Sequence, residues 1–345
     1  MRTLGVFQWL AELIFPPPKA VLLKDFRCDA LEKYNPENKV NVVKPIIKEK
    51  SNIYRPILFK DYIGQTDAKE TIKSYIEGTK KRNKIFPHFL INGSAGCGKT
   101  TLVRIIANEL QVGITELVGK GIFDLEQLVE YFINAQGGIV FVDEIHSLSR
   151  EFVEPLYTIM EDFTYEGQRI EPFIFAGATT EIGEIIKDRR PFYDRFKIKI
   201  ELDDYTIWDI RKIIKNYQMN LYPNDKLEVN DYTRIARNSR LTPRRGINLL
   251  ESTIYLNGDV SKALKNNKII ANGFTRKDLE ALKYISSSTS GVGLESVALY
   301  LDTSKDNYTY DIEPWLLKNR LITRTTKGRK ITETGIKLIK ILQKG

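Results

Sequence analysis

The amino-acid sequence predicts an α/β fold in which helices cover both faces of a parallel sheet, followed by a helical region. Short apolar runs, rich in β-branched and aromatic residues, alternate with helical patterns over residues 51–202. From Thr206 onward, apolar positions such as Ile210, Ile214 and Tyr217 repeat at helical spacing. The chain has 345 residues. At roughly 150 residues per domain, that length suggests two or three domains.

The first segment, residues 1–50, precedes the α/β pattern. Leu4–Phe15 is mostly apolar and is followed by three prolines, which end any helix there. A membrane span needs about 20 apolar residues and a signal peptide needs a small-residue cleavage site, so we expect neither, and no membrane partner. We interpret the apolar stripe as packing on its own domain, with docking of a partner as the alternative. The polar run to Ser51 is interpreted as a linker.

Five apolar runs predict the strands of the sheet. They are Phe89–Asn92, Ile114–Val118, Ile139–Val142, Phe173–Ala176 and Phe196–Leu202. Helical patterns lie between them, as in Lys69–Lys80 and Thr101–Leu110. Continuously apolar strands separated by helices are typical of a parallel sheet that is buried on both faces. We therefore place an α/β domain at residues 51–202.

Two further segments follow the α/β domain. The helical pattern continues through residues 203–273, which predicts a separate helical domain. After Asn272-Gly273, residues 274–345 show short helical patterns. Leu321–Lys330 then predicts two short strands around Lys327-Gly328.

A glycine-rich loop follows the first predicted strand and opens a predicted helix. It matches the phosphate-binding pattern G-x-x-x-x-G-K-[ST] at Gly93, Ser94, Ala95, Gly96, Cys97, Gly98, Lys99 and Thr100. Backbone N–H groups and the helix N-terminus would hold the phosphates of ATP, and Lys99 would reach the β- and γ-phosphates. The Thr100 hydroxyl would bind Mg²⁺, and Cys97 is interpreted as a small apolar spacer.

A pair of acids completes this predicted ATP site. Asp143 and Glu144 follow the apolar strand Ile139–Val142, which places them at the carboxyl edge of the sheet, where open α/β folds bind ligands. Asp143 would hold Mg²⁺ and Glu144 would act as the general base on the attacking water. On its own the pair could equally begin a helix. Its distance downstream of the phosphate loop favours the catalytic interpretation.

Charge and cysteine content narrow the class of protein. The net charge of +9 divides into +3 over residues 1–50, −3 over 51–202, +4 over 203–273 and +5 over 274–345. A basic excess fits a nucleic-acid partner or a merely solvated surface, and here it lies outside the predicted ATP domain. Cys28 and Cys97 are the only cysteines, which favours a reducing compartment over a disulfide framework. Two cysteines and two histidines at this spacing do not make a structural zinc site.

Further motifs in the sequence point to a particular family of proteins. They are Arg55-Pro56, Tyr62–Gln65, Asp143–His146, Met160–Phe163, Gly177–Thr180, Asp194–Phe196, Thr242–Arg244, Gly293–Glu295, Glu313-Pro314 and Lys327–Arg329. In order and spacing, the chain resembles the AAA+ ATPases and, among them, the RuvB family of Holliday-junction branch-migration motors. The resemblance covers residues 54–345. It implies an AAA+ large domain, a helical lid at residues 203–273, a C-terminal winged helix and a ring, typically a hexamer.

The resemblance also implies roles for individual residues. Thr180 aligns with sensor 1, and Arg244 aligns with sensor 2, which bridges the lid and the γ-phosphate. Arg195 aligns with the arginine finger, which one subunit donates to the ATP of its neighbour. The nucleotide-binding set is completed by Arg55, Pro56, Tyr62, Ile63 and Thr101, although packing alone would account for Ile63 equally well.

Alternatives remain for the arginines. Arg195 could instead form a surface salt bridge with Asp194. Arg189 or Arg190 could serve in its place as the finger, and Arg245 could replace Arg244.

Residues 274–345 resemble the winged helix of the RuvB family. Six basic residues occur within 13 positions, with no acid among them: Lys318, Arg320, Arg324, Lys327, Arg329 and Lys330. On a hairpin wing they would contact DNA phosphates without regard to sequence. A solvated basic hairpin is the alternative.

The chain departs from the family between Phe163 and Phe173. There the family has a β-hairpin that docks on RuvA, the junction-binding partner, but only Thr164–Pro172 is present here. The hairpin is expected to be missing or reduced to a turn around Glu166–Gln168, which weakens the expectation of a RuvA-type partner. Residues 1–50 are additional, and we hypothesise that they provide the recruitment surface for a different partner.

The resemblance implies an ATP- and Mg²⁺-dependent translocase of double-stranded or branched DNA, active in recombination and repair. It would work in the cytoplasm of a bacterial or phage-infected cell. Two alternatives stay open. One is an AAA+ loader or remodeller of a DNA-bound protein, such as a clamp or helicase loader. The other is a DNA-binding scaffold that ATP only switches.

Overall fold

A central sheet of five parallel strands organises the α/β part of the chain. The computed structural model describes residues 54–342, so the predictions for residues 1–50 lie outside it. The strands are β1 (Phe89–Asn92), β2 (Ile114–Val118), β3 (Ile139–Asp143), β6 (Ile174–Thr179) and β7 (Ile198–Glu201). They lie in the order β2-β3-β6-β1-β7, and all neighbours pair in parallel. The predicted parallel sheet is confirmed.

The strand β6 extends further than its apolar run predicts. It continues to Thr179 through Gly177, where an added Cβ would lie 2.6 Å from the side chain of Ile145. The small residue is required by this close approach, which is one of the usual reasons for a glycine inside a strand.

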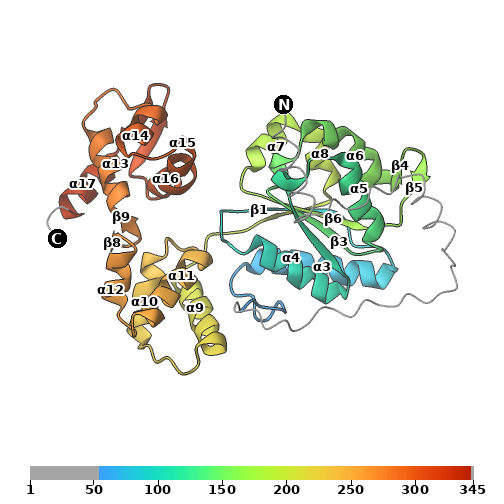
Figure 1. Ribbon diagram of the computed structural model, residues 1–345, viewed down its shortest axis with the longest axis horizontal. Helices are drawn as coiled ribbons and strands as arrows, with labels where there is room; N and C mark the ends of the chain where they lie inside the picture. Colours follow the sequence, from blue (N-terminus) through green and yellow to red (C-terminus); the bar gives the residue numbers. More distant parts are fainter. Residues whose placement is uncertain (1–53, 343–345) are drawn as a thin grey trace, which may run out of the picture. The chain divides into compact units, whose positions relative to one another are not determined.

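Helices cover both faces of the sheet (Figure 1). They are α3 (Thr66–Arg82), α4 (Lys99–Leu110), α5 (Leu125–Asn134), α6 (Arg150–Asp162), α7 (Ile182–Asp188) and α8 (Arg190–Arg195). Side chains alternate along each strand, so Phe89 and Ile91 pack with α3 and α4, whereas Leu90 packs in the core beneath α5 and α6. Both faces are therefore buried, which explains why the strands are continuously apolar.

Four helices form the lid. They are α9 (Ile207–Leu221), α10 (Val229–Asn238), α11 (Pro243–Tyr255) and α12 (Val260–Asn266). The Thr206 hydroxyl accepts the Asp209 N–H, and the Asp209 carboxylate accepts the Thr206 N–H, so a reciprocal capping box starts α9. Ile210 and Ile214 are fully buried, as their helical spacing predicts. A small antiparallel pair, β8 (Ile269–Ala271) and β9 (Phe274–Thr275), follows the lid.

The last part of the described chain is a winged helix with its own core. Its elements are α13 (Arg276–Ser286), α14 (Leu294–Tyr300), α15 (Lys305–Asn307), a π-helix (Tyr308–Ile312), α16 (Glu313–Lys318), β10 (Ile322–Thr325), β11 (Gly328–Ile331) and α17 (Glu333–Leu342). Leu282, Val297 and Leu316 are buried at its centre. The strands β10 and β11 pair in an antiparallel hairpin with Lys327 at the turn, which confirms the two predicted strands.

The segment after α6 carries only a minimal hairpin. The strands β4 (Thr164–Tyr165) and β5 (Gln168–Arg169) have two residues each, and Glu166-Gly167 form the turn between them. The sequence predicted this reduction.

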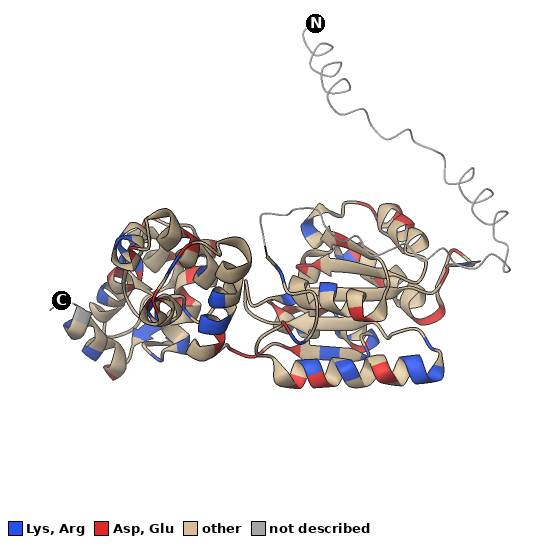
Figure 2. Cartoon of the chain, turned by 90° about the horizontal axis from the view of Figure 1, so that it is seen from below, with Lys and Arg blue, Asp and Glu red and all other residues tan. Residues whose placement is uncertain are grey.

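Charged residues are dispersed over the described helices rather than gathered on one of them (Figure 2). In α3, for example, Lys and Glu alternate with the buried Ile72 and Ile76, because only one side of the helix faces the core. Between residues 54 and 342, no helix is long and apolar enough to cross a membrane.

Candidate functional site

The predicted ATP-site residues meet at one edge of the sheet. The strands β3, β6 and β1 are consecutive neighbours, and each is followed by one part of the site. The phosphate loop follows β1, Asp143 and Glu144 lie at the end of β3, and Thr179 and Thr180 lie at the end of β6. Parallel strands direct their carboxyl ends to the same edge, so the topology brings together segments that are distant in sequence.

The phosphate loop is held by its own lysine and by two tyrosines. The Lys99 ammonium is nearly buried and donates to the Gly93 and Ser94 carbonyls, at 2.8 and 3.2 Å. The Tyr205 hydroxyl donates to the Cys97 carbonyl at 2.9 Å, and the Tyr62 hydroxyl donates to the Gly98 carbonyl at 3.3 Å. Sequence reasoning missed Tyr205, because a single tyrosine after a strand carries no recognisable pattern.

Burial also decides the chemistry of the cysteine in this loop. Cys97 is buried and free. Burial raises the pKa of its thiol, although the nearby Lys99 charge acts in the opposite direction. A protonated, inaccessible thiol is unreactive, which favours the interpretation of Cys97 as a spacer. Burial also raises the pKa of Tyr205 to about 12, so its hydroxyl remains a donor at neutral pH.

Two threonines meet the two acids of the site. The Thr100 hydroxyl donates to Asp143 Oδ2, and the Thr180 hydroxyl donates to Glu144 Oε2, both at 3.4 Å. The Thr100 hydroxyl and the Asp143 carboxylate thus lie side by side at the sheet edge and offer the oxygen ligands that Mg²⁺ binds. Glu144 is separate from this pair and points its carboxylate toward Thr180.

A histidine to which the sequence analysis gave no role lies beside the predicted base. His146 Nδ1 is 3.0 Å from the Thr179 hydroxyl and 3.4 Å from Glu144 Oε2, and its Nε2 is 3.6 Å from Glu181 Oε1. The imidazole therefore lies between two carboxylates at the end of β6. Its position after the acid pair was the available signal, but the pattern alone assigned it no partner.

The lid closes over the sheet edge to form a cavity of about 390 Å³. Of the residues predicted to bind or hydrolyse nucleotide, the cavity wall contains Arg55, Pro56, Tyr62, Ile63, Ala95, Gly96, Gly98, Lys99, Thr100, Thr101, Asp143, Glu144 and Arg244. Gly93, Ser94, Cys97 and Thr180 are joined to these residues through the contacts above. The volume lies within the range of small-molecule sites.

Arg244 reaches this wall from the first turn of α11. It passes so close to the phosphate loop that a Cβ at Gly96 would lie 2.8 Å from the Arg244 Cβ. Gly96 has φ +75°, which also favours glycine. The glycine therefore permits the contact between the loop and the lid.

The lid supplies further wall residues that sequence reasoning did not assign to the site. Ile213, Tyr217, Ile247, Asn248 and Glu251 line the cavity. The Tyr217 hydroxyl donates to Glu251 Oε1 at 2.7 Å. Helical spacing predicts which side of α9 is buried, but it cannot separate a side chain facing the core from one facing a cavity.

Comparisons with known proteins agree on one family. Residues 54–202 match the model of the Holliday junction DNA helicase RuvB P-loop domain, and residues 271–340 match that of the RuvB C-terminal winged helix domain. The chain is 34% identical, over 307 residues, to the Holliday junction branch migration complex subunit RuvB of Mycoplasmopsis pulmonis. That alignment covers 82% of this chain and 96% of the relative. The chain belongs to the RuvB family.

Solved structures point to the same family. The RuvB Holliday junction branch migration motor of Thermotoga maritima superimposes with a TM-score of 0.74 at 33% identity, covering 83% of this chain and 98% of that one. The RuvB of Campylobacter hominis is also 34% identical, over 84% of this chain and 92% of its own length. This RuvB-family chain therefore has the AAA+ α/β domain, helical lid and winged helix that the resemblance implied.

Arg195 of this RuvB-family chain lies outside the cavity. Its guanidinium stacks 4.1 Å above the ring of Tyr157, donates to the Pro191 carbonyl at 2.9 Å, and lies 3.4 Å from Glu161. The alternative pairing with Asp194 is not formed, because Asp194 pairs with Arg190 at 3.4 Å.

The six basic residues of the winged helix divide into two groups. Arg324 and Arg329 both form two hydrogen bonds with Glu313, whose side chain is fully buried. Burial opposes the charge of Glu313, but the two guanidiniums hold its pKa below the usual range. Lys318 pairs with Asp204 at 2.6 Å.

Arg320, Lys327 and Lys330 make up the second group. Their side chains are exposed. Within residues 54–342, none of them forms an ion pair at salt-bridge distance.

Proposed function

We propose that this chain is an ATP-driven motor that moves double-stranded DNA, as a member of the branch-migration class to which its relatives belong. One observation carries the proposal. A single cavity joins the phosphate loop, the two acids and Arg244 of the lid, so binding and hydrolysis of ATP would change how the lid sits on the sheet. In this chain, the lid continues directly into a winged helix, the part that would grip DNA.

The residues of the cavity fit the chemistry of ATP hydrolysis. Lys99 would exchange its bonds to the loop carbonyls for the β- and γ-phosphates, and Arg244 would bind the γ-phosphate from the lid. Thr100 and Asp143 would hold Mg²⁺, which neutralises charge on the phosphates when it is bound. Glu144 would take the proton of the attacking water, with Thr180 holding its carboxylate in place.

The position of Arg195 supports a ring. A finger residue stabilises negative charge on the transferred phosphate, but Arg195 lies on α8, outside the cavity of its own subunit. We infer that it serves the ATP of a neighbouring subunit in a homo-oligomeric ring, a hexamer by family resemblance. Tyr157 and Glu161 would hold the guanidinium in position for that neighbour.

Arg320, Lys327 and Lys330 are the proposed phosphate contacts of the wing. They are exposed and leave their charge available to DNA, whereas Arg324 and Arg329 compensate the buried Glu313 and fix the hairpin to α16. Binding through three exposed basic side chains would be independent of sequence and sensitive to salt.

Recruitment to branched DNA is proposed to use a surface other than β4–β5. This hairpin has two residues per strand, which leaves little area for a RuvA-type partner. Residues 1–50 are the candidate segment for recruitment in the cytoplasm. Deletion of these residues should weaken association with branched DNA in cells and leave ATP hydrolysis by the purified protein unchanged. Unchanged association would exclude this role.

The proposal is tested by the ATPase rate of the purified chain with no DNA, duplex DNA, forked DNA and a four-way junction. We expect duplex or branched DNA to stimulate hydrolysis and electron microscopy of the same samples to show rings. A rate that is equally slow in all four samples would contradict a motor and support a scaffold that ATP only switches.

A further inference from the structure

The lid and the winged helix are joined through one buried arginine. Arg240 lies in the short connection between α10 and α11, and only 5% of its side chain is exposed. Asp278, at the start of α13 in the winged helix, is fully buried and accepts a 2.6 Å bond from Arg240 Nη2. Charged side chains are rarely buried unless they are paired, so each of these two requires the other.

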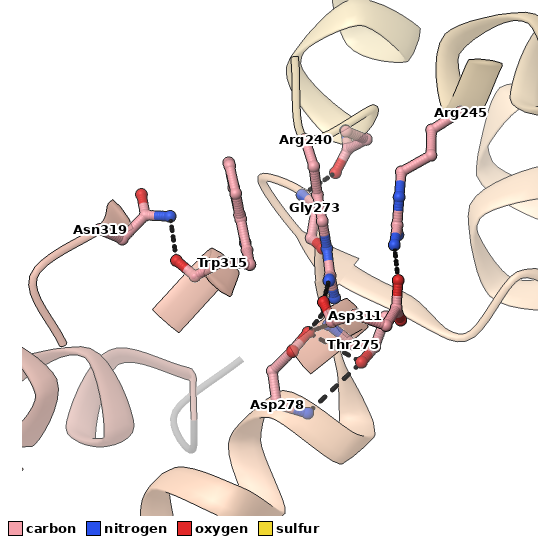
Figure 3. Close-up of polar contacts among 9 residues, drawn as sticks. Arg240, Arg245, Gly273, Thr275, Asp278, Asp311, Trp315 and Asn319 are labelled. Atoms are coloured by element: carbon pink, nitrogen blue, oxygen red, sulfur yellow. Dashed lines mark hydrogen bonds and ion pairs between the residues drawn. The ribbon is translucent and has the colours of Figure 1, made fainter. Parts of the chain in front are cut away.

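The same guanidinium makes two further bonds to the winged-helix side (Figure 3). Arg240 Nε donates to the Gly273 carbonyl at 2.9 Å, and Nη1 donates to the Asp311 carbonyl at 2.7 Å. The π-helix that contains Asp311 is 71 residues downstream of Arg240. One side chain of the lid thus holds the β8–β9 turn, the start of α13 and the π-helix together.

The neighbouring residues are shaped for this contact. Gly273 has φ +78°, and a Cβ there would lie 2.9 Å from the Arg240 Cγ, so a larger residue would displace the guanidinium. Asn238 Oδ1 accepts the Gly273 N–H at 3.1 Å. Asp278 Oδ2 also accepts the N–H and hydroxyl of Thr275, at 2.6 and 2.8 Å. The bonds from Thr275 therefore hold the Asp278 carboxylate in place independently of Arg240.

A second arginine of the same segment reaches the winged helix. Arg245, in the first turn of α11, pairs with the Asp311 side chain, and both side chains are partly exposed (Figure 3). Its neighbour Arg244 points instead into the ATP cavity. Consecutive helix positions are about 100° apart, so adjacent arginines can serve the nucleotide and the winged helix separately.

We propose that Arg240 is a positioning residue that locks the winged helix to the start of α11, so that both turn as one body when Arg244 engages or releases the nucleotide. The inference rests on the proposed motor function. It specifies where movement of the lid is passed on: through three hydrogen bonds of one buried guanidinium, supported by Arg245 with Asp311. A flexible joint here would let the lid move without moving the DNA-binding part.

The double variant Arg240→Met with Asp278→Asn is the appropriate test, because it removes both charges and leaves neither one buried alone. The amide oxygen of the introduced asparagine can still accept the Thr275 N–H. Arg237→Met is the matched control, since Arg237 is an exposed arginine near the end of α10. All variants are made in the full-length chain.

The first measurement is a distance between spin labels at the exposed positions 220, on α9, and 283, on α13. Labels are introduced as non-canonical amino acids, and labelled protein is diluted with unlabelled protein so that each ring carries one pair. The unsubstituted chain and Arg237→Met should give one narrow distance, the same with ADP and with a non-hydrolysable ATP analogue. The double variant should give a broad distribution. A nucleotide-dependent distance in the unsubstituted chain, or a narrow one in the double variant, would overturn the inference.

The second measurement compares DNA movement with ATP use. The double variant should keep its ATPase rate in the absence of DNA, while the length of duplex moved per ATP falls by about tenfold. Normal movement per ATP by the double variant would overturn the inference. If the unsubstituted chain hydrolyses ATP but moves no DNA, the proposed function fails, and the label distances still decide whether Arg240 locks the two parts together.

Discussion

At the scale of single residues, Glu144 is the proposed general base of the ATP site. Its backbone is left-handed, with φ 52°. Its carboxylate accepts a hydrogen bond from the Thr180 hydroxyl and lies beside His146. An unusual backbone at a polar residue in a binding cavity is typical of a functional position. The geometry separates Glu144, the proposed base, from Thr100 and Asp143, the proposed Mg²⁺ ligands.

Glu144→Gln should keep ATP affinity and lower the turnover number by about 10²–10⁴-fold, because the amide retains the shape but cannot accept the proton. Equilibrium binding of a fluorescent ATP analogue and steady-state hydrolysis measure the two effects. Glu154→Gln, on the exposed side of α6, is the matched control and should leave both unchanged. Rapid turnover by Glu144→Gln would show that another group is the base.

His88 illustrates a buried polar residue with a structural role. Its Nδ1 accepts the Phe175 N–H at 2.9 Å, and its Nε2 is 3.0 Å from the Met160 carbonyl, to which it therefore donates. Burial lowers the pKa of His88 from 6.5 to about 4, despite the bond to Met160. In the unfolded chain the imidazole binds a proton at a higher pH than in the folded chain, so acid favours unfolding.

The stability supplied by neutral His88 is complete above pH 6.5 and is lost as the pH falls toward 4. Between pH 7 and pH 4 this corresponds to about 3 kcal/mol of unfolding free energy. His88→Gln preserves a donor and an acceptor but does not titrate. Urea unfolding at several pH values should show the difference between the two proteins shrinking with acid by this amount. Parallel curves would show that the pKa of His88 is not depressed.

At the scale of elements, the basic residues of the wing fall into two kinds: arginines that pair with a buried acid and lysines whose charge is exposed. The buried Glu313 pairs with Arg324 and Arg329 from the two strands, so the attachment of the hairpin to α16 depends on these pairs. Removing one arginine would leave Glu313 less compensated in a buried position and cost stability. Lys327 lies at the turn and Lys330 on β11, and both side chains are exposed, so removal of their charge should change only binding.

Lys327→Ala with Lys330→Ala should weaken DNA binding and lower the slope of log affinity against log salt by about 0.9 for each DNA phosphate that is no longer neutralised. ATP hydrolysis without DNA and the thermal midpoint should not change. Lys212→Ala with Lys215→Ala, two exposed lysines of α9, is the control. An unchanged salt slope in the wing variant would exclude these lysines as phosphate-binding groups. Arg329→Ala, by comparison, should lower the thermal midpoint.

Local patterns predicted the elements, but not all contacts between them. The phosphate loop and the strand ending at Asp143 are each one continuous stretch of sequence, so their conformations and the sheet edge at which they meet followed from strand periodicity. The pairing of Arg324 and Arg329 with Glu313 could not be predicted, because Glu313 is neither close to them in sequence nor marked as buried by any pattern. Arg240 was missed for the same reason: its partners lie 33 to 71 residues away. Charge totals identify a basic segment and do not say which charges are already compensated.

At the scale of the whole molecule, the ATP site is proposed to be completed by a residue of a neighbouring subunit. The other proposed nucleotide-site residues line the cavity or contact residues that do, whereas Arg195 lies outside it. Arg195→Ala should lower turnover by about 10³–10⁵-fold while ATP still binds.

Mixing Arg195→Ala with Glu144→Gln subunits tests whether the finger acts between subunits. Each variant alone should be inactive. In mixed rings, an intact Glu144 in one subunit can meet an intact Arg195 from the next, so hydrolysis should partly return. Mixtures that remain as inactive as the separate variants would place Arg195 in the site of its own subunit.

ATP hydrolysis in the proposed ring is expected to drive movement along duplex DNA. Displacement of a short third strand from a duplex by the purified chain measures this movement directly. We predict displacement that requires ATP hydrolysis, occurs without further proteins and is absent in Glu144→Gln. DNA-stimulated ATP hydrolysis with the third strand left in place would contradict a motor and favour an AAA+ protein that loads or remodels a DNA-bound partner.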